Sequence, residues 1–199
     1  MKRILYYICG CGIFVVVLLG FLKDEKSYVD NDYEDKESVN EVCGNYNKYY
    51  DEELSLKIVN EAKKYVGIPY LFGSKIKDNK AINPVDRYVA IDCSDFVEAV
   101  LESVFNKDYE TTSAEIAYQL KDNCVSLEDI KPGDILLWDD FVSKRVINKY
   151  GRIFHVGIYL GNNRVIESTR TDSYGLYGVV YSDLYRYRGG NLVMIVRAY

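Results

Sequence analysis

The sequence predicts an α+β domain that follows an apolar N-terminal segment. Beyond residue 51, apolar residues first recur at helical spacing, and the last third of the chain holds short apolar runs bounded by turn residues. Such runs are typical of strands, and they follow one another without helical segments between them. Helices followed by consecutive strands indicate helices packed on an antiparallel sheet rather than an alternating βαβ arrangement.

The first 23 residues predict a transmembrane anchor. Residues 4–22 are 19 residues without a charge, just long enough for a helix to cross a bilayer core. Lys2 and Arg3 precede them, so the positive-inside rule places the N-terminus in the cytoplasm and the remainder outside. A cleaved signal peptide and a lipoprotein signal at Cys11 are the alternatives, although no alanine precedes Ala62 to supply the usual cleavage site.

Residues 24–51 are expected to form an acidic linker because they lack apolar periodicity. The charge is −8 over residues 24–53, +3 over residues 1–23 and −5 over the whole chain, so residues 54–199 are neutral. A neutral domain without a basic stripe argues against nucleic-acid binding. The oligomeric state is left open.

The domain is assigned to residues 52–199 and is expected to begin with helices. Apolar residues recur at helical spacing in three segments: 52–66, 93–105 and 111–120. Gly67 and Pro69 end the first of these helices, and the second begins at or just after Cys93. A polar loop separates the two.

Strands are expected in the second half of the domain. They cover four segments: 135–138, 154–161, 164–168 and 192–198. Asn162-Asn163 forms a tight connection, so the second and third of these strands form a hairpin. A polar loop over residues 139–152 joins the first strand to the second.

The chain has five cysteines. Cys9 and Cys11 lie in the apolar segment. Cys43 and Cys124 could pair in an oxidising exterior, but the sequence does not give their distance. Cys93 is left over, and an unpaired thiol outside a cell is either buried or chemically used.

Cys93 and His155, the single histidine, have the properties of a nucleophile and a base. The N-terminus of a helix favours the thiolate, which is the attacking species, and its N–H groups can stabilise an oxyanion. A histidine on a neighbouring strand can take up a proton and return it to a leaving amine.

Strand geometry offers Glu167 as a partner for this histidine. A turn at residues 161–163 would place Gly157 opposite Glu167. Because side chains alternate along a strand, Glu167 would then lie on the face of His155 and diagonal to it. A slip of one residue would turn Glu167 to the other face.

Four motifs occur in order: Tyr65-x-Gly67-x-Pro69-Tyr70-x-Phe72-Gly73, Asp92-Cys93-Ser94-x-Phe96-Val97, Lys131-Pro132-Gly133-Asp134 and His155-Val156-Gly157-Ile158-Tyr159-Leu160-Gly161. Together they closely resemble the NlpC/P60 family of bacterial cell-wall cysteine peptidases, over residues 54–198. The resemblance implies a papain-like fold, with the nucleophile on a helix that packs against an antiparallel sheet carrying the base. It also implies hydrolysis of peptidoglycan stem peptides, commonly between D-glutamate and a diamino acid, without a cofactor.

The family's nucleophile and base match Cys93 and His155, and its third polar residue, twelve positions after the histidine, matches Glu167. The family position that lines the substrate pocket with an aromatic ring matches Tyr70. The family positions that help to hold the substrate's free amino end match Asp92 and Ser94. With the anchor, the resemblance indicates a single-pass protein of a bacterial cell membrane whose catalytic domain faces the wall.

The chain departs from the family in three places. Asp95 stands where the family usually has glycine, Glu167 where it more often has His, Asn or Gln, and the stretch between Tyr70 and Cys93 is longer than usual. These departures put the cleavage specificity in doubt more than the catalysis.

Other interpretations stay open. Cys93 could be a buried structural thiol, Glu167 a solvated strand residue, and Asp92 and Ser94 a helix cap. The same scaffold could also serve an N-acetylmuramoyl-L-alanine amidase, a transacylase or a non-catalytic wall-binding module. A metal site is not expected, because one histidine and scattered thiols give no ligand spacing.

Overall fold

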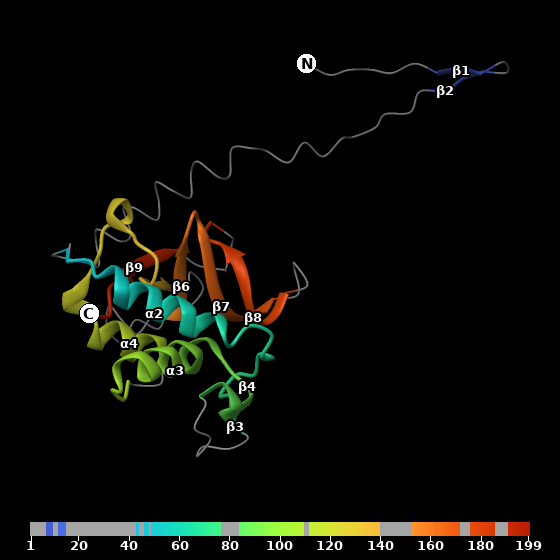
Figure 1. Ribbon diagram of the computed structural model, residues 1–199. Helices are drawn as coiled ribbons and strands as arrows, with labels where there is room; N and C mark the ends of the chain where they lie inside the picture. The colour runs from blue at the N-terminus through green and yellow to red at the C-terminus, as the bar shows by residue number, and fades with distance from the viewer. Residues whose placement is uncertain are drawn as a thin grey trace.

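Three helices cover one side of a five-stranded antiparallel sheet in the computed structural model of the chain (Figure 1). The structure describes residues 7–9, 12–14, 43, 46–47, 49–76, 84–109, 112–139, 153–171, 176–185 and 191–199. The predicted α+β class is confirmed, and all neighbouring strands of the five-stranded sheet run antiparallel.

The helices lie close to their predicted positions. They are α2 (Glu52–Lys63), α3 (Cys93–Phe105) and α4 (Ser113–Gln119), with short 3-10 helices η1 (Pro84–Arg87), η2 (Lys121–Asn123) and η3 (Leu127–Asp129). Asp51 caps α2 by accepting a hydrogen bond from the backbone N–H of Leu54 at 3.0 Å. The helix ends three residues before the predicted end, in turns that lead to Gly67, whose φ is +90°.

The sheet has the strand order β8-β7-β6-β5-β9. Its strands are β5 (Ile135–Asp139), β6 (Ile153–Gly161), β7 (Arg164–Thr171), β8 (Leu176–Asp183) and β9 (Leu192–Val196). A separate pair, β3 (Lys75–Ile76) and β4 (Tyr88–Ala90), joins the ends of the loop between α2 and α3. Strands β3, β4 and β8 were not predicted, although the Tyr and Val residues of β8 favour strands.

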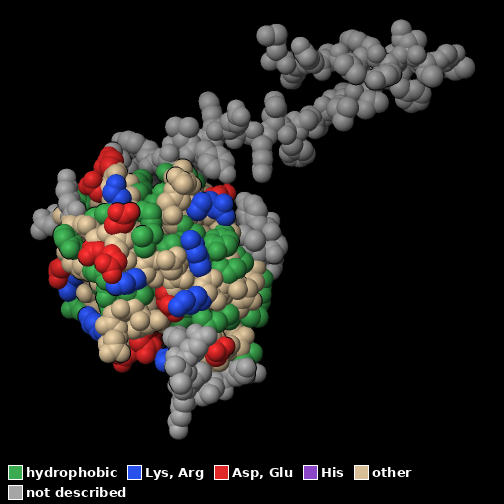
Figure 2. Space-filling model, in the orientation of Figure 1, with side chains coloured by type: hydrophobic (Ala, Val, Ile, Leu, Met, Phe, Trp, Pro, Cys, Tyr) green, Lys and Arg blue, Asp and Glu red, His purple; other side chains and the backbone are tan. Residues whose placement is uncertain are grey.

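Apolar side chains cover both faces of the sheet. Ile135 and Leu137 of β5 belong to the cluster that includes the three helices, whereas Leu136 and Trp138 belong to a second cluster on the opposite face. This explains why β5 reads as a continuous apolar run rather than an alternating one. Figure 2 shows both acidic and basic side chains on the visible face.

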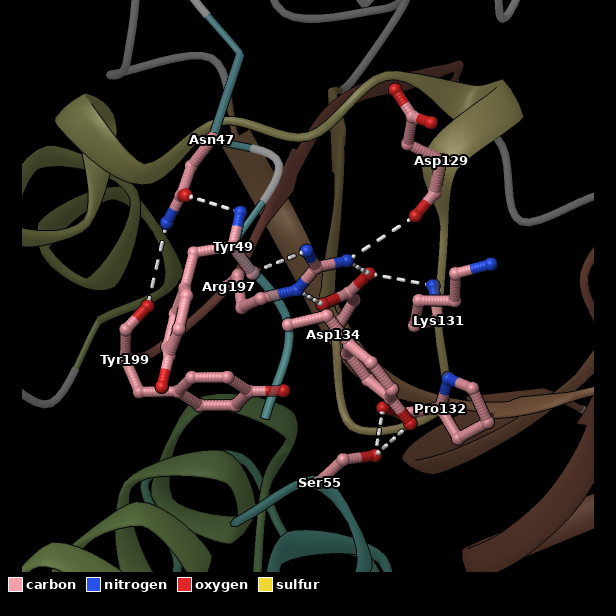
Figure 3. A network of polar contacts seen from close by, with 10 residues as sticks. Asn47, Tyr49, Ser55, Asp129, Lys131, Pro132, Asp134, Arg197 and Tyr199 are labelled. Atoms are coloured by element: carbon pink, nitrogen blue, oxygen red, sulfur yellow. Dashed lines mark hydrogen bonds and ion pairs between the residues drawn. The ribbon is translucent and has the colours of Figure 1, made fainter. Parts of the chain in front are cut away.

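A disulfide and a buried ion pair connect segments that lie far apart in the sequence. Cys43 and Cys124 are bonded, with Cα atoms 5.8 Å apart, so these two cysteines pair. Arg197 forms two hydrogen bonds with the Asp134 carboxylate, from Nε at 2.8 Å and Nη2 at 2.9 Å, and also donates to the carbonyl of Tyr49 at 2.6 Å (Figure 3). These contacts attach the last part of the predicted linker to the domain.

The predicted membrane helix is not confirmed. The described residues include no helix long and apolar enough to cross a membrane. Within the predicted anchor, the structure describes only β1 (Tyr7–Cys9) and β2 (Gly12–Phe14), which pair antiparallel. Aromatic and β-branched residues in these short segments favour extended backbone. The rest of residues 1–23, and the predicted polar loop beyond residue 139 as far as residue 152, lie outside the described residues.

Candidate active site

Cys93 is the first residue of α3, and its thiol is not in a disulfide. It is buried, with 9% of its surface exposed. Asp92 caps the helix in front of it, and the Oδ1 atom of Asp92 accepts hydrogen bonds from the backbone N–H groups of Ser94 and Asp95, both at 3.0 Å. The thiol therefore lies at the positive end of the helix dipole.

The Asp92 carboxylate also connects the helix start to the preceding loop. Its Oδ2 atom accepts a hydrogen bond from Gly73 N at 2.9 Å, and its Oδ1 atom accepts a third one, from the Ser94 hydroxyl at 3.0 Å. The backbone N–H of Asp92 in turn donates to Ser74 Oγ at 2.9 Å. Asp92 and Ser94, both predicted to bind substrate, thus have internal partners and are both buried.

Asp95, the first departure from the family pattern, is half-buried and hydrogen-bonded to Ser74. Burial raises its pKa, the Ser74 hydrogen bond lowers it and the charge of Asp92 raises it, with a net rise. This side chain therefore helps to hold the loop that Asp92 also holds.

His155 lies on β6, close enough to the Cys93 thiol for the two groups to affect each other, and its ring is hydrogen-bonded to Glu167. The Cys93 Sγ atom is 4.0 Å from the carbonyl oxygen of the neighbouring Phe154. The His155 Nε2 atom is 2.5 Å from Glu167 Oε2, which leaves Nδ1 as the ring nitrogen that can face the thiol. The Trp138 ring, directly across on β5, packs on the imidazole with 5.4 Å between ring centroids.

The β6–β7 register brings Glu167 to the histidine. Ile158 pairs with Ile166, so Gly157 lies opposite Glu167, as predicted. The turn is shorter than predicted: it consists of Asn162 and Asn163, both with positive φ, rather than residues 161–163. A one-residue shift in the strand pairing between Tyr159 and Gly161 compensates for the missing turn residue, so the predicted register is kept.

Glu167 is completely buried, so it is not a solvated strand residue. Its second oxygen, Oε1, accepts a hydrogen bond from the hydroxyl of Ser182 on β8. Sequence reasoning missed Ser182, because it lies on the strand that was not predicted. A β8 assignment from its Tyr and Val residues could have pointed to it.

Burial and the two partners act on His155 in opposite directions. Burial lowers its pKa, whereas the hydrogen bonds and charges of Cys93 and Glu167 raise it, and the result is a pKa of about 9. The imidazolium form is therefore favoured at neutral pH, which is the form that can pair with a thiolate.

Tyr70 lies close to Cys93 and Asp92. Its ring meets that of Tyr177 on β8 edge-on, with centroids 6.3 Å apart. Burial, followed by the nearby Cys93 and Asp92, raises the pKa of Tyr70 to about 12, so its hydroxyl stays protonated and can donate a hydrogen bond.

The described residues contain no group of three His, Cys, Asp or Glu side chains that could hold a metal ion. A helix-borne thiol next to a strand-borne imidazole, held in turn by a buried carboxylate, is the arrangement that nucleophilic catalysis by cysteine requires.

The sequence itself matches the NlpC/P60 family model over residues 67–188, and the chain belongs to this family, as its four motifs predicted. It is 31% identical over 115 residues to the gamma-DL-glutamyl hydrolase of Bacillus subtilis (strain 168). That match covers 58% of this chain and 23% of the relative, so the chain spans about a quarter of the relative's length.

Solved structures share the fold. The NlpC/p60 domain of the peptidoglycan hydrolase SagA matches with a TM-score of 0.51 and 24% identity, over 71% of this chain and 97% of that domain. RipD from Mycobacterium tuberculosis, described as a non-catalytic NlpC/p60 domain protein adapted to peptidoglycan binding, matches with a TM-score of 0.53 and 14% identity, over 76% and 100%. At these identities the likeness shows the fold alone.

Proposed function

We propose that this chain is a cysteine peptidase that hydrolyses amide bonds in peptidoglycan stem peptides through a thioester on Cys93. The observation that carries the proposal is the placement of the Cys93 thiol beside His155, whose ring is hydrogen-bonded to the buried carboxylate of Glu167. Membership of the NlpC/P60 family supports the same function.

The reaction would proceed in two steps. The Cys93 thiolate attacks the carbonyl carbon of the amide, and the His155 imidazolium gives its proton to the leaving amine as the C–N bond breaks. A water molecule then attacks the thioester and gives a proton to His155. The C–S bond breaks, the product acid leaves, and the thiolate–imidazolium pair is restored.

The helix start supplies the group that would stabilise the oxyanion. Asp92 already accepts the N–H groups of Ser94 and Asp95. We therefore assign the N–H of Cys93 to the negative oxygen that develops next to the attacked carbon.

For specificity we propose the bond between D-glutamate and a diamino acid. The glutamyl specificity in the name of the Bacillus subtilis relative supports this choice. Tyr70 would line the pocket and donate its hydroxyl to the substrate. Asp92 and Ser94 would contribute negative charge and shape near the substrate's amino end, while their mutual hydrogen bonds keep the helix start in place.

The test is a digest of purified peptidoglycan, followed by mass spectrometry of the products. We expect cleaved stem peptides with the wild-type chain and none with Cys93→Ala or His155→Ala, both with unchanged circular dichroism. Opening of the muramoyl–alanine bond would instead assign an amidase, and transfer of the acyl group to an added amine a transacylase. Wall binding without products, equal in wild type and Cys93→Ala, would assign a binding module and refute the peptidase.

We further propose that the domain acts outside the cytoplasm, tethered by residues 1–23 and the acidic segment 24–51. The uncharged stretch after Lys2 and Arg3 supports the tether, and the disulfide supports an oxidising location. The chain should sediment with membranes and resist extraction by high salt. Release of a shortened chain into the medium would favour a cleaved signal instead.

A further inference from the structure

A fourth side chain continues the hydrogen-bonded series beyond Glu167. Ser182 lies on β8, with 6% of its surface exposed, and its hydroxyl donates to Glu167 Oε1. In the β7–β8 ladder, Val165 pairs with Ser182 and Glu167 with Val180. Ser182 and Glu167 are therefore diagonal neighbours on the same face of the sheet. The series now runs from α3 through three adjacent strands.

A buried carboxylate needs hydrogen-bond donors to remain ionised, because burial penalises its charged form. Glu167 is completely buried and turns one oxygen to His155, at 2.5 Å, and the other to Ser182. The hydroxyl thus stabilises the negative charge and opposes rotation of the carboxylate about its last torsion angle.

We propose that Ser182 is a positioning residue of the active site, which keeps Glu167 ionised and turned so that its Oε2 faces His155. The proposal rests on the catalytic roles proposed above for Cys93, His155 and Glu167. Ser182 does not touch the reacting atoms and acts through Glu167 on the orientation and charge of the imidazole.

The single histidine makes this role directly measurable. In the full-length chain labelled with ¹⁵N-histidine and held in detergent, the ring signals come from His155 alone. Their pH titration measures the imidazole pKa, which we expect at about 9 in the wild type. A serine that only packs in the sheet would leave this titration unchanged.

Three variants test the proposal. Ser182→Ala should lower kcat roughly 10- to 100-fold, with KM nearly unchanged, because a hydrogen bond to a charged group is lost. It should also lower the imidazole pKa by about one pH unit or more. Ser182→Thr keeps a hydroxyl on a strand and should restore most of both properties. Ser126→Ala is the matched control, because Ser126 is also buried and donates to a carboxylate, that of Asp129 at 2.8 Å. It should change neither property.

A double-mutant cycle shows whether Ser182 acts through Glu167. In a Glu167→Ala background, Ser182→Ala should have almost no further effect on kcat or on the imidazole titration. A full additional loss in that background would overturn the proposal. So would Ser182→Ala with wild-type kcat and titration, or a loss of kcat with an unchanged titration.

The titration also separates this inference from the proposed function. If the wild type hydrolyses no peptidoglycan but its imidazole titration depends on Ser182 as described, the positioning role stands and the peptidase proposal fails. If hydrolysis requires Cys93 while Ser182→Ala changes neither kcat nor the titration, the peptidase proposal stands and the positioning role of Ser182 fails.

Discussion

His155 is the residue on which the proposed chemistry depends, because the chain has no second histidine. Each of its two ring nitrogens faces a different partner. Nε2 is hydrogen-bonded to the carboxylate of Glu167, and Nδ1 remains for the thiol of Cys93. A glutamate adds a full negative charge at this position, which a histidine, asparagine or glutamine would not do at neutral pH. Cys93 and this glutamate together raise the imidazole pKa despite burial.

The raised pKa of His155 predicts that stability falls in mildly alkaline solution. Its folded pKa of about 9 lies above the unfolded value of 6.5. The contribution to stability is therefore complete below pH 6.5 and is lost as the pH rises through 9. Between pH 6.5 and 9.5, the free energy of unfolding of the wild type should fall by up to about 3 kcal/mol from this group. Urea denaturation at the two pH values measures the fall.

The control for this prediction is the neutral pair His155→Gln with Glu167→Gln, which keeps hydrogen-bonding groups and removes both charges. Its stability should change less over the same pH range. An equal fall in both proteins would show that other groups are responsible.

At the scale of the elements, strand β8 both supplies Ser182 and fixes the loop that carries Tyr70. The backbone N–H of Val179 donates to the carbonyl of Ile68 at 2.8 Å. Gly178 allows this approach, because its φ is +109° and a Cβ atom there would overlap the Ile68 carbonyl oxygen. The position of Tyr70 therefore depends on a glycine in a strand that follows it by about 110 residues.

Gly178→Ala tests this dependence. Gly67→Ala is the matched control, because Gly67 also has a positive φ, +90°, but nothing lies within 4 Å of the added Cβ. Both variants should lose stability from backbone strain, and Gly178→Ala should lose about 1–3 kcal/mol more from the clash. Urea denaturation measures the difference. Equal losses of stability in the two variants would mean that the loop carrying Tyr70 moves away from the added Cβ atom without a loss of free energy.

At the scale of the whole molecule, two connections each join a terminal segment to the middle of the chain. The disulfide joins Cys43 to Cys124, 81 residues apart in the sequence, and the Arg197–Asp134 pair joins β9 to the turn before β5. Both lie away from the thiol and the imidazole, so they should affect stability rather than chemistry.

Removal of the disulfide should destabilise the folded chain. A disulfide that closes a loop of this length is expected to stabilise the folded chain by up to about 4 kcal/mol, mainly because it restricts the unfolded chain. The comparison is best made in a Cys93→Ala background, where the free thiol of the site is absent and cannot respond to added reductant. In that background, the Cys43→Ser variant and the chemically reduced protein should unfold at the same urea concentration. This concentration should be lower than that of the oxidised Cys93→Ala protein. No shift with reductant would contradict the prediction.

Breaking the buried ion pair should cost more than breaking an exposed one. Arg197 and Asp134 are both buried, so Arg197→Gln leaves a charged carboxylate without its partner and should cost about 3–5 kcal/mol. Lys57→Gln removes a mostly exposed pair with Glu53, 2.8 Å long, and should cost less than about 1 kcal/mol. Thermal and urea unfolding of the two variants measures both. Similar costs would show that burial does not decide the energy of the Arg197 pair.

The sequence indicated much of the site because its signals are local. A cap residue and an apolar stripe mark the start of α3, and therefore place Cys93 at a helix N-terminus. Asn162-Asn163 marks a tight turn. The three-residue turn expected there and the observed two-residue turn with its shift between Tyr159 and Gly161 give the same register, which brings Glu167 to His155. Ser182 and Trp138 escaped this reasoning, because their contacts with the site depend on the order of strands in the sheet.

By itself, the sequence determined the fold class, the family and the residues of the proposed chemistry, because helical and strand periodicity and short motifs are properties of neighbouring residues. Only the tertiary structure decided the environment of those residues. Burial of Glu167 between His155 and Ser182, the hydrogen bond from Gly73 to Asp92, and the pairing of Cys43 with Cys124 all join residues from different segments of the chain. Such contacts follow from the order of the strands in the sheet and from the packing of loops and helices around it, which no local pattern specifies.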